Sequence, residues 1–191
     1  MTAHGWQWIS FSLLTGCLAS FGWAMRRFFV QPAGLTIGMQ VIKACGVAFG
    51  ILHLTAIVVT SGIHAVRGVS GTVLYPCALA LFWWAIQVSL RKPLSAAFSP
   101  DLPRHLVAQG PYRMIRHPLY CSYLLCWVAG GAATGRLWLG PTVAVMLVIY
   151  ARAATEEEKK FTRSPLAEAY QRYRASTGLF LPNPLKRRVQ Y

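Results

Sequence analysis

Long apolar stretches dominate the chain and are separated by short segments rich in charged residues, prolines and glycines. The stretches cover residues 8–25, 33–66, 71–90 and 119–151. Because a transmembrane helix needs about 20 consecutive apolar residues, the first and third stretches each predict one membrane span. The second is too long for one perpendicular span, so we interpret 33–43 as an interfacial helix and 44–66 as a span.

The fourth stretch, 119–151, is too long for one span and barely long enough for two. Gly130-Gly131 and Gly135-Arg136 interrupt it near its middle. A tight helical hairpin fits this pattern, with Arg136 near its tip and each arm lengthened by neighbouring residues. From residue 155 onward the chain is charged with apolar residues interspersed, which predicts an amphipathic helix lying at the membrane interface, ended by Pro182-Asn183-Pro184.

These elements predict an all-α integral membrane protein with about five transmembrane helices, a C-terminal hairpin and an interfacial amphipathic helix. We expect one membrane domain over 1–191, with three N-terminal spans in 8–92 and a functional C-terminal half in 93–185. No Lys or Arg precedes the first apolar stretch. A signal peptide has a basic start, so we expect this stretch to be a retained span.

Composition supports the membrane assignment. The 191 residues are 55% hydrophobic and 13% charged, against about 25% charged in an ordinary soluble domain. The 19 Lys and Arg far outnumber the 5 Asp and Glu, which favours attraction to anionic lipid over nucleic acid. No basic run is interleaved with aromatics, so we expect no nucleic-acid partner. The five cysteines lie in apolar segments without zinc-ligand spacing, and we expect no metal.

Basic residues are also distributed unequally between the two predicted membrane faces. The loops on one face hold only Arg67 and Arg136. The other face collects Arg26, Arg27, Arg91, Lys92, Arg104, Arg113, Arg116 and the basic C-terminal tail. The positive-inside rule therefore predicts a multi-pass protein with residues 104–120 and the C-terminus in the cytoplasm and the N-terminus outside.

Two polar clusters lie on that basic face. The first runs from Arg104 to Tyr120. It contains the string Gly110-Pro111-Tyr112-Arg113-Met114-Ile115-Arg116-His117-Pro118-Leu119-Tyr120, in which Pro118 suits the first turn of a helix. The second runs from Arg152 to Glu158 and contains three of the five acidic residues, Glu156, Glu157 and Glu158. Because the hairpin joins them, we expect the two clusters to lie side by side.

The combined side chains suit a zwitterionic cofactor such as S-adenosylmethionine. A glutamate can bind its ammonium, an arginine or histidine its carboxylate, and tyrosine rings its sulfonium. The sequence has no dinucleotide-binding, Walker, zinc-protease or nucleophile-elbow motif. The alternatives are helix-end snorkelling for Arg116-His117, an interfacial aromatic belt for Tyr112 and Tyr120, and a solvated face for the glutamates.

The string at 110–120 resembles the Gly-Pro-Tyr-Arg-x-x-Arg-His-Pro-x-Tyr signature of the isoprenylcysteine carboxyl methyltransferase family, which is related to phospholipid methyltransferases. The resemblance covers roughly residues 104–182. It implies an integral-membrane methyltransferase that uses S-adenosylmethionine without a Rossmann fold, with its catalytic half in 93–185. Implied cofactor-binding residues are Leu106, Val107, Tyr112, His117, Pro118, Leu119, Tyr120, Glu157 and Glu158.

Arg152 is the implied catalytic residue, associated with the substrate. The family often has His-x-Leu-Val, whereas here His105 stands one place late. Counting from Arg152 selects Glu156 as the cofactor carboxylate, whereas matching the paired glutamates favours Glu157 and Glu158.

We expect a lipophilic acceptor, such as an isoprenylcysteine carboxylate, that enters from the bilayer, with membrane lipids as further partners. Four alternatives remain open. They are a phospholipid N-methyltransferase, a small-thiol S-methyltransferase, an NADPH-dependent enzyme similar to sterol reductases, and a non-enzymatic membrane binding protein.

Overall fold

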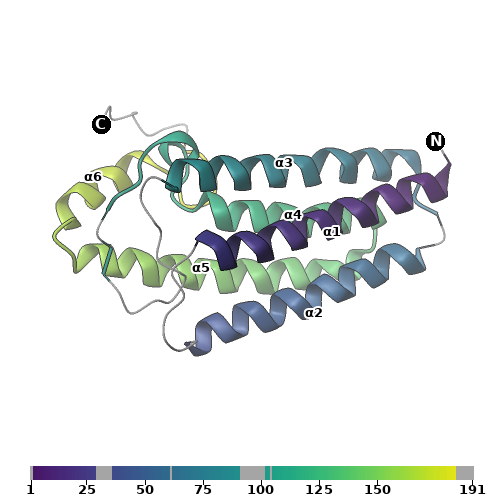
Figure 1. The fold of residues 1–191 in the computed structure, drawn as a ribbon, viewed down its shortest axis with the longest axis horizontal. Helices are drawn as coiled ribbons and strands as arrows, with labels where there is room; N and C mark the ends of the chain where they lie inside the picture. The colour runs from purple at the N-terminus through teal and green to yellow at the C-terminus, as the bar shows by residue number, and fades with distance from the viewer. Residues whose placement is uncertain (1, 29–35, 61, 91–101, 104, 184–191) are drawn as a thin grey trace.

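Five long helices run side by side along the long axis of the molecule (Figure 1). The computed structural model describes residues 2–28, 36–60, 62–90, 102–103 and 105–183. The long helices are α1 (Ala3–Phe28), α2 (Ile37–Val59), α3 (Ala65–Ser89), α4 (Pro118–Thr134) and α5 (Gly140–Thr162). The shorter ones are η1 (Gly110–Arg113), η2 (Leu137–Leu139) and α6 (Ala167–Ser176). The described residues contain no strand, so the prediction of an all-α fold is confirmed.

Most of the long helices have the length and composition of membrane spans. Ala3–Phe28, Ile37–Val59, Ala65–Ser89 and Leu137–Thr162 are each long and apolar enough to cross a bilayer. α4 has 17 residues, which corresponds to about 25 Å of helix, and it packs against α3 within the same bundle. The prediction of a multi-pass membrane protein is confirmed, with four helices that qualify as spans by themselves and α4 beside them.

The boundaries around the second span differ from the prediction. There is no separate interfacial helix within 36–43, because α2 is continuous from Ile37 and is capped by Thr36, whose hydroxyl accepts a hydrogen bond from the Met39 N–H. The chain turns where Gly62 adopts a φ of 80°, and α3 already begins at Ala65. The predicted span 44–66 was therefore wrong at its end. The sequence analysis missed a turn at Gly62, because only a few small polar residues mark it within a largely apolar stretch.

The hairpin has the predicted tip. Gly135 ends α4 with a φ of 65°, and its N–H donates to the Gly131 carbonyl. Arg136 follows at the tip. The predicted start of the C-terminal helix at 155 was wrong, because α5 continues without a break to Thr162 and carries the glutamates in its last turns. The C-terminal helix is α6, which begins only at Ala167. Residues 91–101, which include Arg91 and Lys92, lie outside the described residues, as do Arg104 and the basic tail beyond Asn183.

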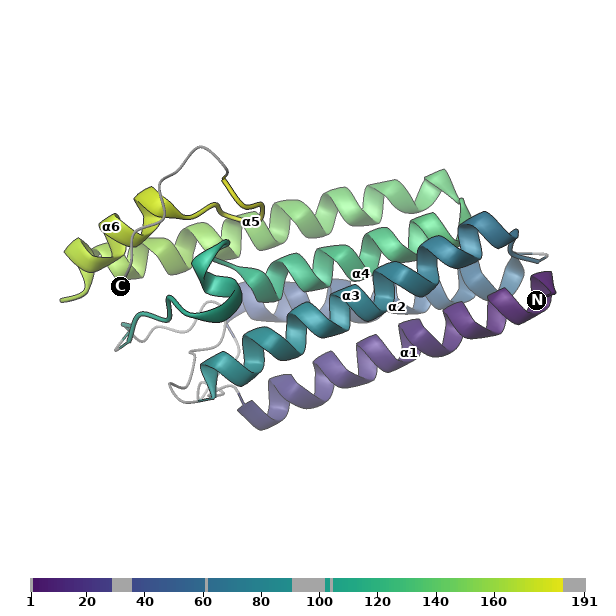
Figure 2. The same ribbon diagram turned by 90° about the horizontal axis from the view of Figure 1, so that it is seen from above.

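Two apolar clusters hold the bundle together. One joins α1, α3 and α4 through buried residues that include Leu14, Phe82 and Cys126. The other joins α4 and α5 around Trp127 and Met146, with partly buried residues of α2 against it. α2 lies beside α1 and α5 along one side of the bundle (Figures 1 and 2). η1, which precedes α4, and α6, which follows α5, lie at the same end of the bundle (Figure 1). The predicted site lies at this end.

Candidate functional site

The 110–120 string forms a tight turn that leads into α4. Gly110 has a φ of 56°, and a Cβ there would lie 2.6 Å from Cγ2 of Val88 on α3. The turn therefore packs directly onto α3, with Tyr112 buried beneath it. Pro118 occupies the first turn of α4 as predicted, and His117 is its N-cap. This arrangement projects His117 and Tyr120 toward the same side of the chain.

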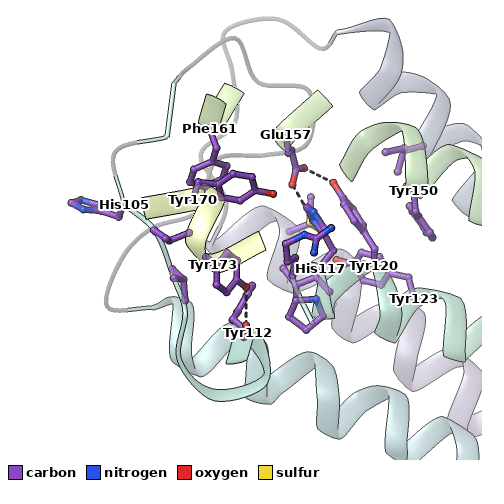
Figure 3. Close-up of a pocket in the computed structure, with 17 residues that line it drawn as sticks. His105, Tyr112, His117, Tyr120, Tyr123, Tyr150, Glu157, Phe161, Tyr170 and Tyr173 are labelled. Atoms are coloured by element: carbon purple, nitrogen blue, oxygen red, sulfur yellow. Dashed lines mark hydrogen bonds and ion pairs between the residues drawn. The ribbon is translucent and has the colours of Figure 1, made fainter. Parts of the chain in front are cut away.

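A cavity of about 150 Å³ lies beside this turn (Figure 3). Eight of the nine predicted cofactor-binding residues line it: Leu106, Val107, Tyr112, His117, Pro118, Leu119, Tyr120 and Glu157. The remaining lining residues are Met25, Ile42, His105, Arg116, Tyr123, Tyr150, Phe161, Tyr170 and Tyr173. The walls thus come from α1, α2, α4, α5 and α6, from η1, and from the segments just before and just after η1.

Glu157 is the carboxylate of the cavity wall. Its Oε1 accepts a hydrogen bond from the Tyr120 hydroxyl at 2.5 Å, and its Oε2 lies 3.6 Å from Nδ1 of His117. The rings of His117 and Tyr120 stack with their centroids 5.6 Å apart and an interplanar angle of 17°. Figure 3 shows these three side chains pointing toward one another. They form one charged and aromatic unit on the cavity wall.

Glu158 is bound by protein cations and does not line the cavity. Its Oε1 lies 2.7 Å from Nε of Arg116 and 3.4 Å from Nε2 of His117. Its Oε2 lies 3.5 Å from Nε of Arg174. The Glu158 side chain is 11% exposed. The two adjacent glutamates therefore have different surroundings, which sequence spacing alone left unresolved.

The other members of the second polar cluster lie away from the cavity. Glu156 is exposed and pairs with Lys159 at 2.7 Å. Arg152 is exposed on α5, immediately before the buried Ala153 and Ala154, and does not line the cavity. The structure thus brings the predicted cofactor residues together, but it does not place Arg152 with them.

Several aromatic residues of the cavity escaped the sequence analysis. Tyr123 follows Tyr120 by three residues on α4, and Tyr150 precedes Glu157 by seven on α5, so each shares a helix face with a predicted residue. The rings of Tyr120 and Tyr150 stack 5.2 Å apart, and those of Phe161 and Tyr170 stack 4.6 Å apart. The helical spacing of these residues was the signal that could have identified them.

Burial keeps two phenols of the cavity wall, those of Tyr112 and Tyr170, neutral. It raises the pKa of Tyr112 and of Tyr170 well above the ordinary tyrosine range. His105, by contrast, is exposed, and Figure 3 shows it pointing away from the other labelled side chains. Within the described ranges, no three His, Cys, Asp or Glu side chains gather in a metal-binding group.

A comparison with protein families matches residues 66–169, more than half of the chain, to phospholipid methyltransferases. The chain belongs to the phospholipid methyltransferase family. That family includes the isoprenylcysteine carboxyl methyltransferases, so the resemblance drawn from the 110–120 string is confirmed at this level. A search of curated proteins gives no match. The matched residues contain η1, α4 and α5 and include most of the residues that line the cavity. Family membership makes the protein a membrane methyltransferase.

Proposed function

We propose that this methyltransferase uses S-adenosylmethionine and transfers its methyl group to a lipophilic acceptor, such as an isoprenylcysteine carboxylate, at the membrane. The observation that carries the proposal is the cavity, which combines one carboxylate, two imidazoles, one guanidinium and several aromatic rings at the end of an apolar helix bundle. These are the groups that a zwitterionic sulfonium compound requires in its binding site.

The residues of the cavity fit this cofactor. Glu157 can bind the ammonium, because its carboxylate faces the cavity and is bonded there only by a phenol and an imidazole in the contacts observed. Glu158 is already surrounded by Arg116, His117 and Arg174. Tyrosine rings of the cavity wall can face the sulfonium, and Leu106 and Val107 offer apolar contacts for the adenine. When bound, S-adenosylmethionine supplies an electrophilic methyl group.

The protein contributes orientation and exclusion of water. Tyr120 and His117 hold the Glu157 carboxylate in one orientation, so little reorganisation is needed when a ligand ammonium arrives. The aromatic rings that surround the cavity keep water from the space where the acceptor is methylated. Methyl transfer by in-line displacement depends more on such alignment and desolvation than on a strong base.

The apolar wall supports a lipophilic acceptor. Met25 of α1 and Ile42 of α2 line the cavity, and both helices expose large apolar side chains such as Trp23 and Val47 on their outer surfaces. An apolar acceptor can therefore approach from the bilayer along the ends of α1 and α2. A phospholipid amine is a second candidate acceptor, favoured by the family match and by the phenols of Tyr120, Tyr123 and Tyr150, which suit a cationic headgroup.

Binding measurements on purified protein in detergent test the cofactor. We expect calorimetric titration to give saturable binding of S-adenosylmethionine and no binding of NADPH. The reverse result would support the reductase alternative and contradict the proposal. Binding of neither compound would favour a non-enzymatic membrane protein.

Transfer of a radiolabelled methyl group tests the acceptor. A farnesylated cysteine carboxylate, phosphatidylethanolamine vesicles and a short thiol are compared at equal concentration. Transfer to the first supports the main proposal, and transfer to the second supports the phospholipid alternative. Transfer only to the short thiol would contradict a lipophilic acceptor while leaving the cofactor proposal intact.

We further propose that the cavity faces the cytoplasm. Arg26 and Arg27 occupy the last turn of α1 at this end of the bundle, in keeping with the positive-inside rule. Single cysteines can be introduced into a cysteine-free variant at Glu168, whose side chain is 83% exposed, and at Leu137, which is 94% exposed. In intact cells an impermeant maleimide should label position 137 and leave position 168 unlabelled. The opposite pattern would reverse the orientation.

A further inference from the structure

The segment after α6 runs beside the start of α4. We call residues 177–181 the C-terminal strap. Gly178 donates its N–H to the Met114 carbonyl at 3.2 Å, and its own carbonyl accepts the Arg116 N–H at 2.8 Å. The Leu179 carbonyl accepts the His117 N–H at 3.2 Å. Residues separated by about sixty positions thus form a short parallel pairing, with Ile115 opposite Gly178.

This pairing supplies bonds that α4 itself does not provide. The backbone N–H groups at the start of a helix have no carbonyl one turn earlier to receive them. Arg116 and His117 occupy that position before Pro118. The strap carbonyls fix the backbone from which the His117 ring extends toward Glu157 and the cavity.

Side chains of the strap also support the cavity wall from outside it. The Phe180 ring meets the His117 ring edge to face, with centroids 6.3 Å apart. Leu179 and Phe180 pack against the buried cluster that contains Tyr120 and Tyr150. Neither Leu179 nor Phe180 lines the cavity. They contact residues that do line it, such as His117 and Tyr120, on the side away from the cavity.

One guanidinium joins the strap to the rest of the site. Arg116 donates from Nη1 to the Thr177 carbonyl at 2.5 Å and from Nε to Glu158 at 2.7 Å. The Arg116 and Glu158 side chains are 9% and 11% exposed. This contact connects α5, the start of α4 and the strap through a single side chain.

Gly178 allows the strap to fold back on itself. A Cβ at this position would lie 1.7 Å from the Leu181 carbonyl oxygen and 2.9 Å from its carbonyl carbon. Because both are backbone atoms, no side-chain adjustment can relieve the overlap. Any larger residue at 178 must therefore displace the strap, although the residue touches no part of the cavity.

We propose that the C-terminal strap is a positioning element of the cofactor site, which orients His117 and Tyr120 and whose docking is coupled to cofactor binding. This inference rests on the proposed function. Coupling is reciprocal: if the docked strap favours cofactor binding, bound cofactor must favour the docked strap by the same factor. Thr177, Gly178 and Phe180 thereby influence the site without touching the ligand.

The test compares Gly178→Ala with Gly131→Ala. Gly131 lies on α4, and a Cβ there would meet nothing within 4 Å, so the control makes the same chemical change without an overlap. A cofactor-free measurement follows carbethoxylation of His117 by diethyl pyrocarbonate with mass spectrometry. We expect the His117 rate to rise severalfold in Gly178→Ala and to stay unchanged in Gly131→Ala, with the exposed His64 as internal reference. Equal His117 rates in both variants would overturn the proposal.

Cofactor binding provides the second measurement. We expect Gly178→Ala to weaken S-adenosylmethionine binding about tenfold or more and Gly131→Ala to change it less than twofold. If Gly178→Ala does not fold, hydrogen exchange of the wild type decides: S-adenosylhomocysteine should slow exchange in residues 177–181, and unchanged exchange would overturn the coupling. If the wild type binds neither compound, the proposed function fails, and the His117 rates still decide whether the strap positions the site.

Discussion

The two ends of the helix bundle both bury polar side chains, but they bond them differently. At the end opposite the cavity, the Gln7 amide donates to the carbonyls of Ile57 and Val58 at 2.9 and 2.8 Å. These carbonyls belong to the last turn of α2, where a helix leaves such groups without intrahelical partners. At the same end, Arg136 donates from Nε to the Thr60 hydroxyl at 3.4 Å.

At the cavity end, charged groups converge from several elements instead. Arg116 and His117 approach Glu158 within 3.4 Å, and Tyr120 and His117 approach Glu157. Figure 1 shows the start of α4, the end of α5 and α6 meeting at this end of the bundle. The partners are ionic, they are shared among several side chains, and one carboxylate remains beside a cavity.

The difference separates polar groups that complete helix packing from polar groups that are available to a ligand. At the opposite end, the Gln7 and Arg136 side chains donate to neutral acceptors at the end of α2, so these contacts stabilise the bundle. At the cavity end, Glu158 is satisfied by the protein, whereas Glu157 keeps a side facing the cavity. Perturbing members of each group should therefore change either stability or binding.

The largest change in stability should come from Arg116→Met. The substitution leaves the buried Glu158 without its shortest ionic contact and removes the side-chain bond to the Thr177 carbonyl of the strap. Removing one partner of a buried ion pair costs about 3 kcal/mol or more. Unfolding in detergent, followed by circular dichroism, measures the loss. Arg172→Met is the matched control, because Arg172 pairs with Glu168 at 61% and 83% side-chain exposure, and such pairs contribute under about 1 kcal/mol. Equal losses of unfolding free energy in the two variants would show that the buried Arg116–Glu158 pair stabilises the protein no more than an exposed pair does.

The next effect concerns binding rather than stability. Glu157→Gln keeps the shape of the side chain and removes the charge that we assign to the cofactor ammonium. Losing a charge-assisted hydrogen bond costs about 1.5–3 kcal/mol, which is roughly ten- to a hundredfold in affinity for S-adenosylmethionine. Titration calorimetry measures it, with the exposed Glu156→Gln as a control of unchanged affinity. Similar affinities in both variants would remove Glu157 from the site.

The sequence predicted the class of the fold and the cavity end well, because both depend on strong local signals. Apolar stretches bounded by charges specify membrane helices, and Pro118 together with Gly135 specifies where α4 begins and ends. The wall residues of the 110–120 string follow from their placement on one turn and the first turn of α4. These features need no knowledge of distant contacts.

The sequence failed where tertiary contacts decide. The turn at Gly62 lies inside an apolar run and is fixed by packing against the start of α1, where the Ile63 N–H donates to the Ala3 carbonyl. The different partners of Glu157 and Glu158 depend on where α4 and the strap lie beside α5. The strap itself has no periodic pattern, and its pairing partner is about sixty residues away.

A third comparison tests whether the bundle interior is independent of the cavity. At Gly130 a Cβ would lie 2.2 Å from Nδ1 of the buried His53, whereas at Gly131 it would meet nothing within 4 Å. Gly130→Ala should therefore lower the free energy of unfolding by about 2 kcal/mol through overpacking, and Gly131→Ala should not lower it. In both folded variants the affinity for S-adenosylmethionine should match the wild type. A large loss of affinity in Gly130→Ala alone would mean that the bundle interior and the cavity are coupled.

The smallest effect should come from Tyr112→Phe. This substitution separates the role of the ring in the cavity wall from the role of the hydroxyl in helix packing. The Tyr112 ring lines the cavity, but its hydroxyl lies 3.1 Å from the Ser89 hydroxyl on α3. Ser89 uses its own proton on the Ala85 carbonyl, so Tyr112 is the donor, and burial raises its pKa far enough to keep it protonated. The substitution removes one neutral hydrogen bond, worth about 1 kcal/mol of stability, while the ring remains in the wall.

Unfolding of Tyr112→Phe, Ser89→Ala and the double variant should show losses that are not additive, with cofactor affinity within twofold of the wild type in each. Additive losses with a tenfold weaker affinity in Tyr112→Phe would instead show that the Tyr112 hydroxyl contacts the ligand. The polar contact beside α3 would then serve ligand binding and not helix packing.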